Sequence, residues 1–405
     1  MALAVTIFAA TYVVIASGRT KWLPVGRPLG ALIGGALMVL SGVLAPRAAL
    51  EAIDVDTLVL LLGLMGIGGF LAESGFLDRS ADWLAARCRT RARLLGALVW
   101  SAGLLAAVIT NDAVCVLGAP IVVAWVRRLG LPPLPFLLAL ATAANTGSVA
   151  TLVGNPQNML CGRIGALEYR EYLAHLAPVA LAGLALNHAL LALAFRKSLA
   201  GELPHTPLAK VVDRASAVTL LVLGASIAGY LAGLPLAWTA LAGFAALAVL
   251  LRAGPRRALK GVDLSVLVFF VGLFVAVEGL SASGAARWSF DRLPLLAGAS
   301  DAAAHWRASG LFLAGSNLVS NVPFILVVQD ELARFPDRVL AWELLAMSST
   351  FAGNLTLLGS VANVIVAERG RDVGGLRFIS YLAVGFPLAL ATTAAGTAWL
   401  LWLHG

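Results

Sequence analysis

The stretch ANTGSVATLVGNPQN, from Ala144 to Asn158, decides the fold, because its polar residues interrupt an apolar segment of membrane-spanning length, Leu134 to Ile164. Three asparagines, two glycines and a proline fall within it. Non-helical backbone at membrane depth is tolerated only where protein buries it or where it lines a wet cavity. A segment interrupted in this way therefore indicates a transporter's binding site, the alternative being a kinked structural helix.

The composition is that of a membrane protein. The 405 residues are 60% hydrophobic and 12% charged, with a mean hydropathy of +0.91, whereas soluble domains are roughly a quarter charged. We therefore expect a multi-pass protein surrounded by the lipid bilayer. The net charge of +8 lies in short loops between apolar spans, which indicates membrane topology and not nucleic-acid binding. Cys88, Cys115 and Cys161 are too few and too scattered for a metal cluster, so no cofactor and no structural or catalytic metal is expected.

The order of spans repeats, which predicts two halves, 1–200 and 215–405, joined by a cytoplasmic linker at 201–214. The segment TLVLLLGLMGIGGFLAESG starting at Thr57 aligns with VLVFFVGLFVAVEGLSASG starting at Val266, a shift of 209. Two further alignments follow in the same order: Thr110-Asn111 with Ser320-Asn321, shifted by 210, and TLVGNPQN from Thr151 with TLLGSVAN from Thr356, shifted by 205. Because polar positions and glycines match as well as apolar ones, we interpret the halves as a duplication.

Charge counting predicts how the halves cross the membrane. We expect re-entrant hairpins at about 94–129 and 305–333 and discontinuous helices at about 134–165 and 339–366. Each half then has about five transmembrane spans, and the odd number makes the repeats inverted. With both termini outside, 21 of the 29 Lys and Arg residues lie in inside loops; if the hairpins crossed fully, only 16 would. The predicted fold class is therefore an all-α membrane protein with two inverted-topology repeats.

The polar interruptions form two pairs that inverted halves bring together near the bilayer midplane. Small Ser, Thr, Asn and Gly residues offer neutral oxygens to Na⁺ and N–H or O–H donors to an anion. Asp112 stands out, because a carboxylate at a hairpin tip costs about 2.5–3.5 kcal/mol on insertion scales and usually serves ion or proton traffic. Its alternative role is an N-cap for the hairpin's second helix.

Four motifs resemble the paired signatures of the ion transporter superfamily: TNDAVCVLGAPIV from Thr110, ANTGSVATLVGNPQN from Ala144, SNVPFILVV from Ser320 and AGNLTLLGSVAN from Ala352. That group includes arsenite-efflux permeases, NhaD-type sodium/proton antiporters and citrate and divalent-anion symporters. The chain looks nearer to the uncharacterised anion-permease branch. The resemblance implies inverted repeats, re-entrant hairpins, discontinuous helices and a transport domain that moves like an elevator.

The resemblance also implies which residues bind substrate and ions. The first hairpin tip would be Thr110, Asn111 and Asp112, and the second would be Ser320 and Asn321. The first helix break would be lined by Asn145, Thr146, Gly147, Gly154, Asn155 and Asn158, and the other by Gly353, Asn354, Gly359, Ser360 and Asn363. The symporters' tips typically read Ser-Asn-Thr, whereas these read Thr-Asn-Asp and Ser-Asn-Val. Asp112 therefore favours proton coupling or cation antiport.

The sequence as a whole predicts a secondary active transporter in the cytoplasmic membrane, not an enzyme. It would move a small inorganic or organic anion, with arsenite among the candidates, by elevator-type alternating access coupled to H⁺ or Na⁺. A Na⁺/H⁺ antiporter and an anion channel are the alternatives. The direction of transport and the oligomeric state, a homodimer included, stay open.

Overall fold

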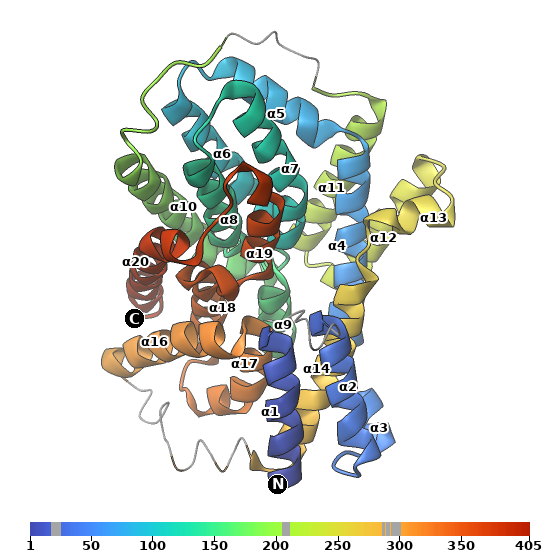
Figure 1. The fold of residues 1–405 in the computed structure, drawn as a ribbon. Helices are drawn as coiled ribbons and strands as arrows, with labels where there is room; N and C mark the ends of the chain where they lie inside the picture. The colour runs from blue at the N-terminus through green and yellow to red at the C-terminus, as the bar shows by residue number, and fades with distance from the viewer. Residues whose placement is uncertain (18–25, 205–210, 286–287, 289–291, 293–300) are drawn as a thin grey trace.

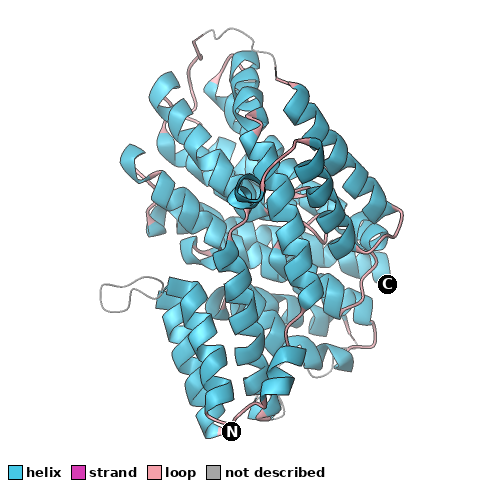
Figure 2. Cartoon of the chain, turned by 90° about the vertical axis from the view of Figure 1, so that its right-hand side faces the viewer, coloured by secondary structure: helices cyan, strands magenta, loops and turns pink. Residues whose placement is uncertain are grey.

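A computed structural model describes the chain except for residues 18–25, 205–210, 286–287, 289–291 and 293–300. The regular elements of the described ranges are helices, with one isolated bridge between Thr90 and Glu202 (Figure 2). The fold class is thus confirmed as all-helical. Residues 205–210 of the linker predicted at 201–214 lie outside the described residues.

The first half contains ten of the described helices. They are α1 (Ala2–Ser17), α2 (Gly26–Leu40), α3 (Pro46–Glu51), α4 (Val55–Glu73), α5 (Phe76–Arg87), α6 (Arg91–Ala106), α7 (Asn111–Leu129), α8 (Pro133–Ser148), α9 (Pro156–Ile164) and α10 (Tyr169–Ala194). The short helix α3 is not foreseen in the sequence. The break between α8 and α9 lies within the polar stretch from Ala144 to Asn158.

The second half follows the same order (Figure 1). Its helices are α11 (Arg214–Leu231), α12 (Leu236–Leu250), α13 (Pro255–Ala258), α14 (Leu264–Ala282), α16 (Ala302–Val319), α17 (Asn321–Val328), α18 (Arg338–Leu355), α19 (Val361–Arg369) and α20 (Phe378–His404). Four 3₁₀ turns accompany them: η1 (Leu259–Gly261), η2 (Gln329–Arg334), η3 (Leu357–Gly359) and η4 (Arg371–Val373). Helices α4, α10, α11, α14 and α20 are long and apolar enough to span a membrane, and α1, α2 and α12 are shorter apolar helices.

Two glycine contacts show that the halves pack by the same rule. A Cβ on Gly63 of α4 would lie 2.6 Å from the carbonyl carbon of Ala240 in α12. A Cβ on Gly272 of α14 would lie 2.4 Å from the carbonyl carbon of Ala31 in α2. The residues of each pair, Gly63 with Gly272 and Ala31 with Ala240, are separated by the shift of 209 found in the sequence. The third span of each half therefore packs closely on the second span of the other, as inverted repeats require.

Both hairpins return to the face from which they start. Near the start of α6 the Arg91 N–H donates to the Gly201 carbonyl at 3.2 Å, and at the end of α7 Arg128 pairs with Asp82 of α5. The helix before the tip and the helix after it therefore end on one face. In the second hairpin the His305 ring of α16 lies 5.8 Å from the Phe335 ring beyond η2. The re-entrant form of both hairpins is thus present.

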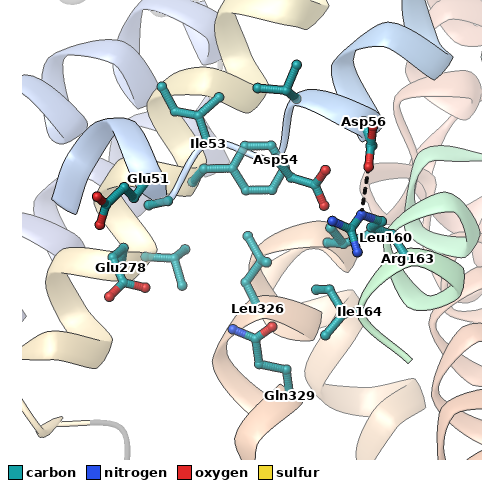
Figure 3. A pocket seen from close by; sticks show the side chains of 14 residues that line it. Glu51, Ile53, Asp54, Asp56, Leu160, Arg163, Ile164, Glu278, Leu326 and Gln329 are labelled. Carbon is teal, nitrogen blue, oxygen red and sulfur yellow. Dashed lines mark hydrogen bonds and ion pairs between the residues drawn. The ribbon is translucent and has the colours of Figure 1, made fainter. Parts of the chain in front are cut away.

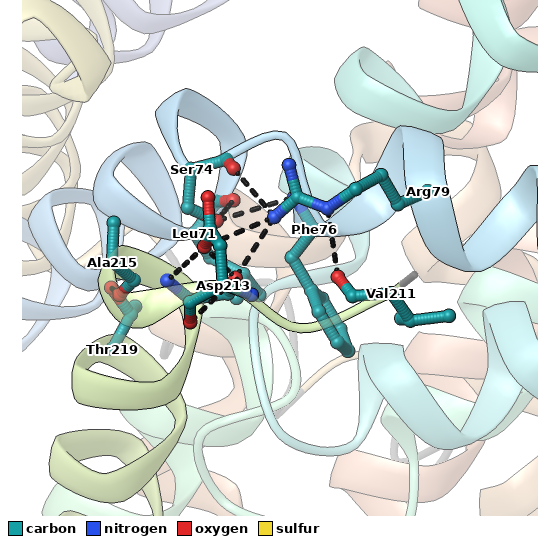
Figure 4. Close-up of polar contacts among 9 residues, drawn as sticks. Leu71, Ser74, Phe76, Arg79, Val211, Asp213, Ala215 and Thr219 are labelled. Atoms are coloured by element: carbon teal, nitrogen blue, oxygen red, sulfur yellow. Dashed lines mark hydrogen bonds and ion pairs between the residues drawn. The ribbon is translucent and has the colours of Figure 1, made fainter. Parts of the chain in front are cut away.

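An arginine of α5, Arg79, connects the two halves near the linker. Arg79 of α5 donates to the Ser74 and Val211 carbonyls at 2.9 and 2.8 Å, and its guanidinium lies 3.1 Å from the Asp213 carboxylate (Figure 4). Asp213 in turn caps α11 through the Ser216 N–H at 2.9 Å. The start of the second half is therefore fixed directly to the first.

Candidate functional site

The two helix breaks are closed by the same hydrogen bonds. Asn158 donates from Nδ2 to the Ser148 and Thr151 carbonyls, both at 3.0 Å. Asn363, 205 residues later, donates to the Gly353 and Thr356 carbonyls at 2.7 and 3.2 Å. These carbonyls are left without helical partners where α8 and α18 end. The asparagines thus provide the hydrogen-bond donors that the free carbonyls of a helix break need at membrane depth.

The breaks are also joined to each other by matched contacts. In one, Asn155 donates to the Thr350 hydroxyl at 3.2 Å, and Thr350 donates to Asn158 Oδ1 at 2.9 Å. In the matching set, Ser360 donates to Asn145 Oδ1 at 3.2 Å, and Asn145 donates to Asn363 Oδ1 at 3.0 Å. Every residue in one set corresponds to a residue of the other by the shift of 205. The duplication therefore extends to the polar centre of the molecule.

Asn145 connects the breaks to a hairpin tip. Its Oδ1 accepts from Asn111 Nδ2 at 2.9 Å, and its Nδ2 also donates to Asn354 Oδ1 at 3.1 Å. Asn354 continues the network by donating to the Thr146 hydroxyl at 2.9 Å. The second tip, at Ser320, has a left-handed backbone with φ +73° and ψ 147°. That region strongly favours glycine, so the tip stores local strain.

A cavity of about 720 Å³ lies where the two tips meet the second break, and we call it the tip cavity. Of the residues predicted for the site, its wall contains Asn111, Asp112, Ser320, Asn321, Gly359 and Ser360. Asn321 Oδ1 is buried and has no hydrogen-bond partner among the described residues. Asn321 therefore lines the wall with no hydrogen bond fixing its side-chain oxygen among the described residues.

Asp112 stands at the junction of the tip cavity and a second cavity of about 720 Å³, the basic-face cavity, whose wall includes Arg257 and Lys260. Its carboxylate lies near the Ala362 N–H at the start of α19 and is subject to the charges of Arg27 and Asp263. Thr110, and not Asp112, caps α7, because the Thr110 hydroxyl accepts from the Ala113 N–H at 3.4 Å. The carboxylate is therefore free for another role.

The remaining predicted site residues line neither the tip cavity nor, apart from Thr110, the basic-face cavity. They lie behind the tip cavity wall, in or beside the buried network: Asn145, Thr146, Gly147, Gly154, Asn155, Asn158, Gly353, Asn354 and Asn363. Gly147 is required for close packing, since a Cβ there would lie 2.0 Å from the Gly103 carbonyl oxygen. The Gly154 carbonyl accepts from the Asn111 N–H at 2.9 Å and so fixes the first tip to the first break.

The sequence analysis did not single out several residues that line the tip cavity. Arg27 at the start of α2 and Asp263 at the start of α14 are both distant in sequence from the tips, and Asn317 precedes the second tip. Asn317 accepts from the Thr356 hydroxyl at 3.3 Å, which matches the bond from Thr151 to the Ala107 carbonyl in the first half. A shift of 210 applied to Ala107 would have indicated Asn317.

A third hollow, the acidic pocket, lies on the other side of α14 from the tip cavity and has a volume of about 500 Å³. Figure 3 shows Glu51, Asp54 and Glu278 around it, with Asp56 paired to Arg163 at 3.1 Å. It shares no lining residue with the tip cavity. Helix α14 separates the two: Phe270 faces the tip cavity, Phe274 faces the acidic pocket, and their ring centroids are 6.0 Å apart.

Inverted repeats, paired helix breaks and a cavity at two re-entrant tips define a multi-pass membrane transporter. The chain belongs to the citrate transporter family, whose sequence pattern matches residues 12–352. It is 30% identical to the silicon efflux transporter LSI3 of Oryza sativa, over 93% of this chain and 92% of that protein. A transporter named arsB in Dictyostelium discoideum is 26% identical over 96% of this chain and 90% of its own length. The crystal structure of the Alcanivorax borkumensis YdaH transporter shares the fold, with a TM-score of 0.56, 15% identity and coverage of 99% and 97% of the two chains.

Proposed function

We propose that this protein is a secondary active transporter of the cytoplasmic membrane, with both termini outside. It moves a small inorganic or organic anion by elevator-type alternating access and couples that movement to H⁺, with Na⁺ as the other candidate ion. The observation that carries the proposal is the tip cavity, because one wall combines Asn111 and Asp112 of the first half with Asn321 and Ser360 of the second.

The chemistry of the tip cavity suits an anion that binds together with a proton. The start of α19 directs backbone N–H groups and the positive end of a helix dipole at it, and Arg27 adds a full positive charge. With Asp112 ionised, its carboxylate lies beside these donors near Ala362 and would compete with an anion for them. Protonation of Asp112 would release them to a substrate anion, so proton and anion would bind together.

The separation of the cavities supports alternating access over a channel. The tip cavity and the basic-face cavity share Asp112 and Asp263, whereas the acidic pocket shares no residue with either. A channel would need a continuous polar path, whereas the walls of the tip cavity and the acidic pocket carry the neighbouring apolar rings of Phe270 and Phe274. In the elevator mechanism, ligand binding changes the relative stability of two such states.

One observation favours a second function, the Na⁺/H⁺ antiporter. Asp112 and Asp263 both line the two joined cavities, and two carboxylates with neutral oxygens nearby suit a cation. In that case Na⁺ and H⁺ would compete for Asp112, and no anion would be carried.

Ligand-induced thermal stabilisation of the purified protein tests the proposal. The compounds are citrate and silicate, after the names of the family and of one relative, together with arsenite, phosphate and sulfate, each with and without Na⁺. A ligand at 100 times its Kd stabilises the folded state by about 2.7 kcal/mol. We expect one anion to raise Tm, with Ser360→Ala and Asn321→Ala abolishing the shift and Ser349→Ala, buried on α18 away from the cavities, preserving it. A shift with Na⁺ alone would support the antiporter instead, and an anion shift unchanged in both cavity variants would refute the site.

A further inference from the structure

We propose that His175, Glu343 and His404 form a binding site for a divalent transition-metal ion, with Zn²⁺ the best match to the ligand set. The residues come from three helices, α10, α18 and α20, which pack together on one side of the molecule (Figure 1). Their ligand atoms all lie within 4.8 Å of one another. Two imidazoles and one carboxylate are a common ligand set for zinc with an open fourth position.

The geometry places the carboxylate between the two rings. Glu343 Oε1 lies 2.8 Å from His175 Nδ1, and Glu343 Oε2 lies 3.1 Å from His404 Nε2. Ligands around a tetrahedral zinc with bonds of about 2.1 Å are roughly 3.4 Å apart, so the two carboxylate–imidazole contacts of 2.8 and 3.1 Å would lengthen slightly on metal binding. The side chain of Glu343 is 1% exposed, whereas those of His175 and His404 are 18% and 12% exposed. Water can therefore reach the fourth position from one side.

The hydrogen-bond partners of His404 call for a cation at its other nitrogen. His404 Nδ1 lies 2.9 Å from Asp337 Oδ2, and a carboxylate oxygen accepts, so Nδ1 is the donor. A neutral imidazole then directs the lone pair of Nε2 at Glu343 Oε2. Two acceptors at 3.1 Å repel unless a proton or a metal ion lies between them. An imidazole fixed by a carboxylate on its outer nitrogen is the usual second shell of a zinc site.

Two further contacts stabilise the positions of the histidines. Trp399 of α20 donates from Nε1 to the His175 carbonyl of α10 at 2.9 Å, and the two histidine rings meet edge to face at 5.3 Å between centroids. Sequence spacing does not reveal this site, because the two histidines lie 168 and 61 residues from Glu343. A metal ion here would fasten the end of α20 to the starts of α10 and α18.

Zinc binding by the full-length protein tests the proposal. The protein is purified through an N-terminal tag without histidines, stripped with EDTA and titrated with ZnCl₂, with bound zinc measured by mass spectrometry and Tm recorded in parallel. We expect one zinc per chain and a higher Tm. His175→Gln and His404→Gln should each weaken zinc binding by about 100-fold or more, and Asp337→Asn by about 10- to 100-fold.

The matched control is His188→Gln on α10, which lies outside the cluster and should bind zinc like the wild type. Should one histidine variant fail to fold, the other keeps the test decisive. A wild-type protein that binds no zinc would overturn the proposal and leave a shared proton as the cation. Zinc binding that survives both His175→Gln and His404→Gln would overturn it as well.

Discussion

Asn145 Nδ2 lies 3.0 Å from Asn363 Oδ1, so the end of α8 is hydrogen-bonded directly to the start of α19, 218 residues away. Both side chains are fully buried or nearly so, and Asn363 also closes the second helix break. This contact joins the two halves at their polar centre.

Removing the Asn145 amide should destabilise the whole transport core. Asn145→Ala leaves buried groups on Asn111 and Asn363 unpaired, at a cost of about 1–3 kcal/mol. The measurement is Tm of the purified protein, compared with Asn363→Ala and the double variant. We expect the double variant to lose less than the sum of the two, since contacting residues show coupling of about 0.5–3 kcal/mol. Strictly additive losses would show that the contact does not join the halves.

The strained tip residue should be replaceable by glycine with a gain in stability. Ser320 has φ +73°, which glycine adopts without steric cost, and such strain costs about 1–3 kcal/mol. Ser320→Gly should raise Tm, whereas Ser320→Ala should not. If the strain serves substrate binding, Ser320→Gly also weakens the ligand-induced shift. A lower Tm in Ser320→Gly than in Ser320→Ala would contradict this account of the tip.

The aromatic barrier between the tip cavity and the acidic pocket should limit leakage. Phe274→Ala removes the ring that separates the two hollows and should raise downhill ion leak through proteoliposomes. Burial losses for Phe→Ala are about 3–5 kcal/mol, so Phe274→Leu serves as the milder variant with an intermediate leak. Folded variants with wild-type tightness would show that the barrier lies elsewhere.

The hydrogen bonds from Ser216 to Asp213, together with the nearby Arg79, should make the stability of the protein depend on pH. Hydrogen bonds from the Ser216 side chain and then its N–H, with the Arg79 charge, lower the pKa of Asp213 from its ordinary 3.8. A lowered folded-state pKa contributes stability above the ordinary value, and that contribution disappears as pH falls through the folded-state value. Asp213→Asn should therefore lower Tm at neutral pH and cease to matter in strong acid. A Tm difference that stays constant down to low pH would contradict a stabilising role for the ionised Asp213 carboxylate.

Much of the fold followed from the sequence, because hydrocarbon strongly penalises unpaired backbone and thereby makes the breaks at Asn145–Asn158 and Gly353–Asn363 conspicuous. The shift of 209 also pairs Gly63 with Gly272, and the structure shows that these two glycines make equivalent packing contacts. The short helices α3 and α13 escaped notice, since six and four residues give too little periodicity.

The site was less accessible to sequence reasoning. Asn155 and Asn321 look alike in their motifs, yet Asn155 is buried against Thr350 while Asn321 lines the tip cavity. Arg27 and Asp263 act on Asp112 only through the packing of separate helices. Some polar residues face a cavity, and others hydrogen-bond the free carbonyls of a helix break. The difference depends on the direction of the side chain, which sequence spacing alone does not encode.

The central claim is that the tip cavity binds an anion together with a proton on Asp112. It is tested most directly by anion uptake into proteoliposomes under an imposed pH gradient, with the anion found in the stabilisation assay. We predict accumulation above the external concentration that collapses when the gradient is dissipated, and loss of this pH dependence in Asp112→Asn with folding retained. Equilibration without accumulation, or accumulation by Asp112→Asn that follows the gradient as in the wild type, would contradict the account.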